Sequence, residues 1–179
     1  MKEEKSGSKK LELLKTQLLS NSEHTVIEAL DGIRTEGEAE ILPTVLELLA
    51  ETDNPDIEAG IIQLLFDLQT DDAVPYLIDG LNNQRLKHFH NFLISAFWQS
   101  SLDGSEHLTL FVTKAVKGDY MICLEALTVI ENFDGVFTVA EIQHCASILS
   151  EGIDREKQKE KKELLKSMLE VVEQLATEE

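Results

Sequence analysis

A proline-containing phrase that occurs twice constrains the fold of this chain most strongly. Residues 40–49 read EILPTVLELL and residues 73–81 read AVPYLIDGL, so that Pro43 and Pro75 align with a spacing of 32 residues. In each phrase the apolar residues after the proline recur with helical spacing, and the proline falls in the first helical turn, where a missing N–H costs little. The phrase is therefore predicted to be one amphipathic helix that the chain forms twice.

The segment before each proline helix is also repeated. Ile27, Leu30 and Ile33 align with Ile62, Leu65 and Leu68 at a spacing of 35 residues. A period in the thirties with two helices in each unit is typical of an α-solenoid, in which helical hairpins stack on their neighbours. The sequence therefore predicts an all-α chain built from helical hairpins.

Two further hairpins follow with a looser pattern. A third has its apolar stripes in residues 90–97 and 107–116, and a fourth in residues 122–133 and 136–149, where Val139, Ile142, Cys145 and Leu149 are the expected core positions of the last helix. The predicted domains are an N-terminal tail and capping helix over residues 1–20, four hairpins over residues 21–152, and an amphipathic capping helix over residues 153–179. The apolar stripe of that last helix could instead pair with a second chain, so the chain is predicted to be a monomer or a weak dimer through its C-terminal helix.

Residues that begin and end helices agree with this periodicity. Ser20 and Glu23 have the spacing of a capping box, and Asn54-Pro55-Asp56 offers an N-cap, a proline at the first helical position and an acid in the first turn. Glycine is expected to end helices at five positions, which are Gly37, Gly104, Gly118, Gly135 and Gly152.

The phrase DDAVPYLIDGL, residues 71–81, resembles the second helix of the HEAT and armadillo repeat family, in particular the short bacterial HEAT-like repeats. The resemblance covers residues 21–151 in outline, but only the first two hairpins carry the proline phrase, and the sequence lacks the repeated Asp and Arg pair of longer HEAT units. It implies a right-handed α-α superhelix whose second helices line a concave surface for a partner. A fold of this kind does not determine a function by itself.

The charge of the chain is unevenly distributed. The net charge is −18, and residues 21–83 hold fifteen Asp and Glu against a single basic residue, Arg34, whereas residues 84–118 carry a small positive excess. Such an acidic surface repels phosphate backbones and anionic membranes and attracts basic partners. The alternative is that the acidity serves only solubility.

Candidate metal and catalytic residues are few. Ser22-Glu23-His24 and Ser105-Glu106-His107 repeat an acid next to a histidine, which fits helix capping or, alternatively, one half of a metal site. The sequence contains no zinc-binding spacing, no glycine-rich phosphate loop and no recognisable nucleophile with its base. It therefore predicts a protein that is not an enzyme and uses no cofactor, with a metal-dependent or lyase-like HEAT-repeat enzyme as the alternative.

The remaining prediction is a protein-protein interaction scaffold that binds a basic or amphipathic segment of a partner in an acidic concave groove. The groove residues would lie opposite the apolar stripes of the second helices, and Tyr76 would be an aromatic anchor. The predicted partner-binding residues are Glu47, Glu51, Tyr76, Asp79, Asn83, Lys114, Lys117 and His144.

Three smaller predictions complete the sequence analysis. Trp98 is expected to fill the junction with the next hairpin, with partial exposure in a contact patch as the alternative. Cys123 and Cys145 lie in apolar helical contexts and are expected to be reduced core thiols. The polar start MKEEKSGSKK has no apolar stretch behind it, which predicts a soluble, cytoplasmic protein.

Overall fold

The chain folds into helices joined by short links. The computed structural model describes the backbone of residues 2–36 and 39–177 and the side chains of residues 9–35 and 39–177. Within these residues the prediction of an all-α fold is confirmed, and the one extended contact is an isolated bridge between Phe137 and Thr177. The α-helices are α1 (Lys2–Leu18), α2 (Glu23–Glu36), α3 (Leu42–Glu51), α4 (Pro55–Phe66), α5 (Val74–Asn82), α6 (His90–Gln99), α7 (Leu108–Lys117), α8 (Tyr120–Glu131), α9 (Val139–Arg155) and α10 (Lys159–Gln174).

These helices form two compact units. Unit 1 is Met1–Leu102 and contains α1 to α6, and unit 2 is Asp103–Glu179 and contains α7 to α10. Short 3₁₀ helices at Ala39–Ile41, Asp71–Ala73 and Ser105–His107 precede α3, α5 and α7, and a longer one, Gln84–Phe89, leads into α6. The boundary between the units falls inside the third predicted hairpin.

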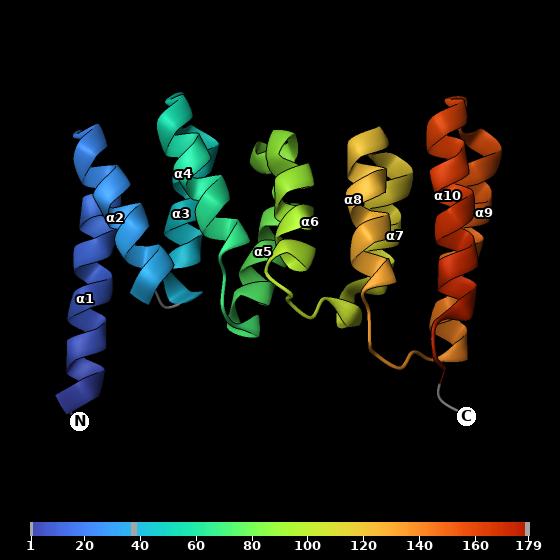
Figure 1. The fold of residues 1–179 in the computed structure, drawn as a ribbon, viewed down its shortest axis with the longest axis horizontal. Helices are drawn as coiled ribbons and strands as arrows, with labels where there is room; N and C mark the ends of the chain where they lie inside the picture. Colours follow the sequence, from blue (N-terminus) through green and yellow to red (C-terminus); the bar gives the residue numbers. More distant parts are fainter. Residues whose placement is uncertain (1, 37–38, 178–179) are drawn as a thin grey trace. The chain divides into compact units, whose positions relative to one another are not determined.

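The helices of unit 1 lie in two layers (Figure 1). One layer holds α1, α3 and α5, and the other holds α2, α4 and α6. Successive helices pack most extensively as α1 with α2, α3 with α4, and α5 with α6, so the observed pairing differs from the predicted one by one helix. A link of four residues connects α1 to α2, and a link of three residues connects α3 to α4. Such short links force the two helices of a pair to lie side by side. The predicted N-terminal capping helix is thus the first member of the first pair.

The core of unit 1 repeats with the spacings read from the sequence. Leu42, Val45 and Leu49 in α3 are buried, as are Val74, Leu77 and Leu81 in α5, each 32 residues later. In the preceding helices the buried positions are Val26, Ala29 and Leu30, matched 35 residues later by Ile61, Leu64 and Leu65. The spacing is therefore confirmed, and Leu30, Ile33 and Leu65 are buried as predicted. Ile27 and Ile62 are only half-buried, because Val26 and Ile61 take the core positions there, and Leu68 lies beyond the end of α4.

Helix ends follow the predicted chemistry in part. Asn54 caps α4 as predicted, because its Oδ1 accepts hydrogen bonds from the N–H groups of Asp56 and Ile57 at 2.9 and 3.4 Å. At the start of α2 the capping box predicted from Ser20 is wrong, because Ser20 Oγ accepts from Ser22 N–H. The capping expected of Ser22-Glu23-His24 is confirmed, since Ser22 Oγ accepts from Thr25 N–H at 3.4 Å. Gly118 follows α7 directly, Gly104 and Gly135 lie in the links after α6 and α8, and Gly37 lies outside the described residues.

Gly152 was also assigned wrongly, because it lies inside α9 rather than at a helix end. It is buried against α7, and a Cβ added at this position would stand 2.8 Å from Cγ2 and 2.9 Å from Cγ1 of Val116. No real Cβ makes contacts this short with both branches of a side chain. The glycine is therefore present because α7 and α9 approach closely at this point.

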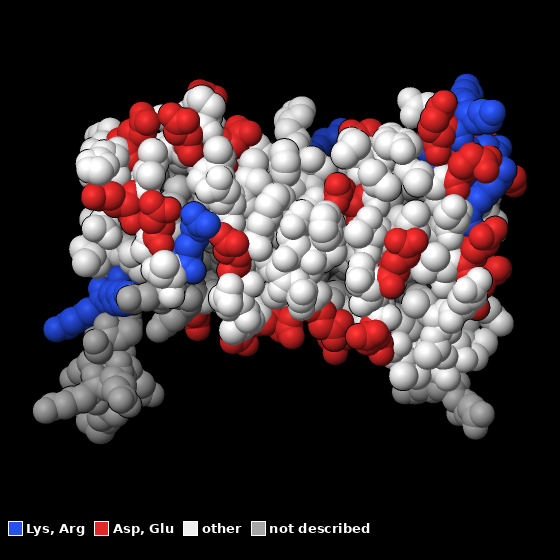
Figure 2. All heavy atoms as spheres, viewed as in Figure 1, with Lys and Arg blue, Asp and Glu red and all other residues white. Residues whose placement is uncertain are grey.

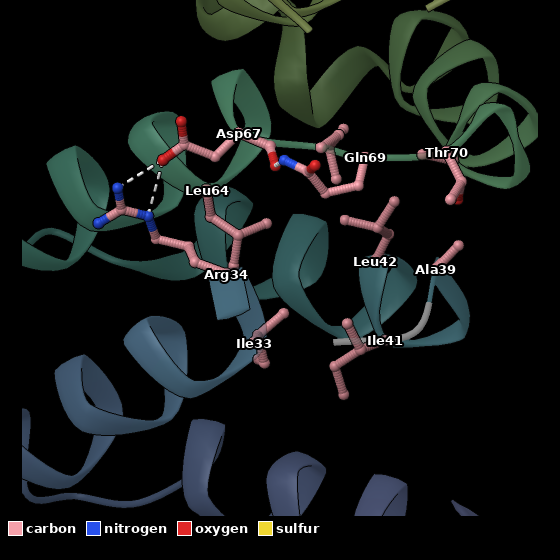
Figure 3. Close-up of a pocket in the computed structure, with 11 residues that line it drawn as sticks. Ile33, Arg34, Ala39, Ile41, Leu42, Leu64, Asp67, Gln69 and Thr70 are labelled. Atoms are coloured by element: carbon pink, nitrogen blue, oxygen red, sulfur yellow. Dashed lines mark hydrogen bonds and ion pairs between the residues drawn. The ribbon is translucent and has the colours of Figure 1, made fainter. Parts of the chain in front are cut away.

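An Arg–Asp ion pair joins two neighbouring pairs of unit 1. Arg34 in α2 donates from Nε to Asp67 Oδ2, which lies just after α4, at 2.9 Å, and a second bond from its Nη2 reaches the same oxygen. Figure 3 shows this pair at the rim of a small cavity that Ile33, Leu42 and Leu64 line. The sequence lacked a repeated Asp and Arg pair, yet a single pair of this kind bridges successive hairpins here.

Unit 2 is a group of four helices. The helices α7 and α8 pack together, as do α9 and α10, and each helix also contacts one from the other pair, α7 with α9 and α8 with α10. The apolar stripe of α10, Leu165, Met168 and Val172, is completely buried in these contacts. The stripe proposed for pairing with a second chain is therefore already occupied within unit 2.

Two expected core residues are on the surface instead. Trp98, at the end of α6, is 37% exposed, and Val139, in the first turn of α9, is 52% exposed. For Trp98 the alternative of partial exposure is the correct one. Among the described residues, no helix combines the length and the apolar composition that crossing a bilayer requires.

A buried lysine of α10 forms a hydrogen bond with the backbone of α7. Lys161 is 5% exposed, and its Nζ donates to the carbonyl oxygen of Val116 at 3.0 Å and lies 2.9 Å from Glu156 Oε2. The other carboxylate oxygen of Glu156 accepts from the N–H groups of Gln158 and Lys157 at 2.9 and 2.8 Å. The hydrogen bond from Gln158, followed by that from Lys161, lowers the pKa of Glu156 from its ordinary value of 4.5 to about 2.

Both cysteines are buried, as predicted. Burial raises the pKa of Cys123 to about 11 and also raises the pKa of Cys145, whose Sγ lies 3.5 Å from Thr109 Oγ1. Neither forms a disulfide.

The close approach of α7 and α9 makes a clear prediction about Gly152. Gly152→Ala should lower the free energy of unfolding by about 1–3 kcal/mol, because the new methyl group overlaps Val116. Gly32→Ala is the matched control: nothing lies within 4 Å of its Cβ position in α2, so it should raise stability by about 0.5–1 kcal/mol. Urea unfolding followed by circular dichroism measures both, and equal effects of the two variants would show that the packing argument is wrong.

The Glu156 interactions predict acid sensitivity. The folded protein holds this carboxylate ionised to lower pH than the unfolded chain does, so its stabilisation is complete above about pH 5 and is lost as the pH falls from 4.5 towards 2. Glu156→Gln should flatten the stability profile in that window, whereas Glu170→Gln, at an exposed position of α10, should leave it unchanged. Urea unfolding at a series of pH values measures this, and parallel profiles for the wild type and Glu156→Gln would contradict it.

The two thiols should be protected by folding. At pH 8 the native protein should react with a colorimetric thiol reagent far more slowly than the urea-denatured protein, in which both Cys123 and Cys145 should titrate. Rapid titration of the native protein would mean that the thiols are accessible.

Candidate partner-binding surface

Four of the eight predicted binding residues meet in one hollow of unit 1. The hollow has a volume of about 180 Å³ and lies between α3, α5 and the 3₁₀ helix that follows α5. Its lining residues are Pro43, Leu46, Glu47, Tyr76, Asp79, Gly80, Asn83 and Leu86. The helices α3 and α5 are the two copies of the proline helix, and Glu47 and Asp79, which occupy equivalent positions 32 residues apart, both line the hollow.

Gly80 allows the floor of this hollow to form. It is buried in α5, and a Cβ added there would lie 3.2 Å from Leu46 Cδ1 and 3.3 Å from Leu93 Cδ1. Because the glycine has no side chain, the leucines of α3 and α6 reach the backbone of α5. Leu46 and Leu86 then give the hollow an apolar base.

The rim of the hollow is polar on the α5 side. Asp79 is exposed and Tyr76, one turn earlier on the same helix, is half-buried. None of the salt bridges found in the described part of the chain involves Asp79. An aromatic ring and a carboxylate thus stand beside an apolar base.

Glu47, on the α3 side of the rim, and Glu51, one turn further along α3, are bound by an arginine of the same chain. Arg85 donates from Nη1 to Glu47 Oε1 at 2.6 Å and from Nη2 to Glu51 Oε1 at 3.1 Å. Glu47 and Glu51 are one turn apart on α3, so the two branches of a single guanidinium reach both carboxylates. The hydrogen bond to Glu47, followed by that to Glu51, raises the pKa of Arg85.

Asn83 holds the segment that carries this arginine. Its Oδ1 accepts a hydrogen bond from Arg85 N–H at 3.0 Å and so caps the 3₁₀ helix Gln84–Phe89. The predicted role of Asn83 in binding a partner is therefore accompanied by a structural one. Sequence reasoning missed the role of Arg85, because no local pattern shows that its side chain reaches Glu47 and Glu51, more than thirty residues earlier in the chain.

The other three predicted residues lie in unit 2. Lys114 is half-buried and Lys117 is exposed in the last turn of α7, and His144 is exposed on α9. Burial lowers the pKa of Lys114, and the nearby charge of Lys117 lowers it further. This pair is the basic part of the predicted binding surface.

Acidic side chains are dense in residues 21–83 of unit 1. Figure 2 shows Asp and Glu side chains over α2 and α4, and the two basic residues between Asn21 and Leu86, Arg34 and Arg85, are both paired with acids. Much of the acidic charge in this stretch is therefore not balanced by a neighbouring base. This distribution favours association with cations or basic segments.

The two Ser-Glu-His segments serve as helix starts. Ser22 caps α2, and His24 lies 3.5 Å from Glu28 one turn further on; in the second segment, Asp103 Oδ1 accepts from Ser105 N–H at 2.9 Å. No group of three or more His, Cys, Asp or Glu side chains within the described ranges is arranged to hold a metal ion.

Comparison of the sequence with protein-family models found no match, and comparison with curated protein sequences found none either. The resemblance to HEAT and armadillo repeats therefore stays a prediction that rests on the repeated proline phrase.

Proposed function

We propose that this protein is a protein-binding module and that the α3–α5 hollow of unit 1 binds a basic, amphipathic segment of a partner. The observation that carries the proposal is the hollow itself, which combines an apolar base of Leu46 and Leu86 with the exposed carboxylate of Asp79. An apolar side chain of the partner would cover the base, and a neighbouring Lys or Arg would pair with Asp79.

The apolar base of the hollow and the charged rim are expected to have different roles in binding. Binding sites on protein surfaces derive most of their affinity from a few buried anchors, for which the base of the hollow and the ring of Tyr76 are suited. Charges at the rim contribute mainly to the association rate and to the choice of partner. The acidic surface of unit 1 would therefore draw in a basic segment, and the hollow would retain it.

The electrostatic part of this proposal predicts a salt-sensitive interaction. A labelled helical peptide with Lys and Arg on one face and Leu on the other should bind the protein, and an otherwise identical peptide with Glu in place of the basic residues should not. Fluorescence anisotropy at low ionic strength measures the affinity, which should fall as salt is added. Equal binding of both peptides, or binding that salt does not change, would contradict the proposal.

Substitution of Asp79 tests where the peptide binds. Asp79→Asn should weaken the basic peptide about 2- to 5-fold, which is the effect of losing one exposed charge pair of roughly 0.5–1 kcal/mol. Glu58→Gln removes the same charge from α4, outside the hollow, and should have a smaller effect. Equal effects of the two variants would indicate attraction to the net charge of the protein rather than to the hollow.

A further inference from the structure

Arg85 lies where a partner's basic side chain would be expected. Its guanidinium spans Glu47 Oε1 and Glu51 Oε1 at 2.6 and 3.1 Å, and Glu47 is one of the residues that line the hollow. The carboxylates of α3 thus already have the spacing that a guanidinium requires. The chain's own arginine fills a site that would otherwise recognise an arginine from outside.

The contact is exposed and can be exchanged. The side chains of Arg85, Glu47 and Glu51 are 51%, 50% and 59% exposed. Solvated ion pairs of this kind contribute little net stability, because water competes for both charges. Displacing Arg85 therefore costs little, and the 3₁₀ helix that carries it is held separately by the cap from Asn83.

We infer that Arg85 is an intramolecular competitor that occupies the Glu47–Glu51 pair and limits binding of arginine-containing partner segments at the α3–α5 hollow. The inference rests on the proposed function, since it concerns the same site. An incoming arginine must take both carboxylates from Arg85, so its apparent Kd rises in inverse proportion to the fraction of time that Arg85 leaves them free. A lysine of the partner has a single ammonium group and cannot bind both carboxylates in the way a planar guanidinium does. Its affinity should therefore increase less when Arg85 no longer occupies Glu47 and Glu51.

The test compares two arginines that are both paired with acids in unit 1. Arg85→Gln should tighten binding of an arginine-rich amphipathic peptide about 2- to 5-fold and steepen its salt dependence, because Glu47 and Glu51 become available. A lysine-rich version of the peptide should gain less. Arg34→Gln changes the net charge equally but releases Asp67, which does not line the hollow, and it should leave the affinity within about 2-fold of the wild type.

Two further variants separate competition from a structural effect. Arg85→Lys should give an affinity between those of the wild type and Arg85→Gln, and adding Glu47→Gln and Glu51→Gln to Arg85→Gln should remove the gain. Circular dichroism should show the same helicity for every variant. Fluorescence anisotropy with both peptides provides the affinities.

The outcomes distinguish this inference from the function on which it rests. Peptide binding by the wild type that Arg85→Gln leaves unchanged or weakens would overturn the competitor role while preserving the binding site. Equal tightening by Arg85→Gln and Arg34→Gln would also overturn it, since net charge would then explain the gain. Failure of the wild type and of Arg85→Gln to bind either peptide would overturn the proposed function and this inference together.

Discussion

Burial of one apolar stripe per helix is the constraint on which the rest of this structure depends. A helix with a single stripe must cover it with neighbours, and within each unit the chain does so by placing successive helices side by side and packing one pair against the next. Two glycines stand where neighbouring helices approach closely. The missing side chain of Gly80 leaves space for leucines of α3 and α6, and that of Gly152 leaves space for Val116. The α3–α5 hollow follows from this packing, because the missing side chain of Gly80 helps to form its base.

Charged groups add to this apolar framework in two different ways. Lys161 is buried and satisfied by the Val116 carbonyl and Glu156, so it fixes how α10 lies against α7. Arg34 and Arg85 form exposed pairs that connect elements of unit 1 more than thirty residues apart in the chain. The pair of Lys161 and Glu156 is costly to break, since the buried lysine would lose its partners away from water, whereas the exposed pairs can be exchanged for other ligands.

Sequence reasoning located much of the candidate site but misjudged its charge. The proline phrase placed Glu47, Tyr76, Asp79 and Asn83 on equivalent helix faces, and the structure brings these four residues to one hollow. The local pattern could not show that Arg85 folds back onto α3, because that contact depends on the path of the link after α5. The same limit applies to Gly152 and Trp98, whose roles depend on which helices pack beside them.

The sequence by itself determined the helical class, the spacings of 32 and 35 residues, the burial of both cysteines and the acidic character of residues 21–83, because each follows from residue type and local periodicity. Only the tertiary structure decided which helices pair. A repeated sequence superposes on itself whichever helix is counted as the first of a pair, so the repeat spacing does not show which two consecutive helices pack together. The short links between helices and the contacts between their buried faces decide that pairing. The tertiary structure also decided that Glu47 and Glu51 share one guanidinium, since long-range ion pairs depend on the distance between elements rather than on sequence spacing.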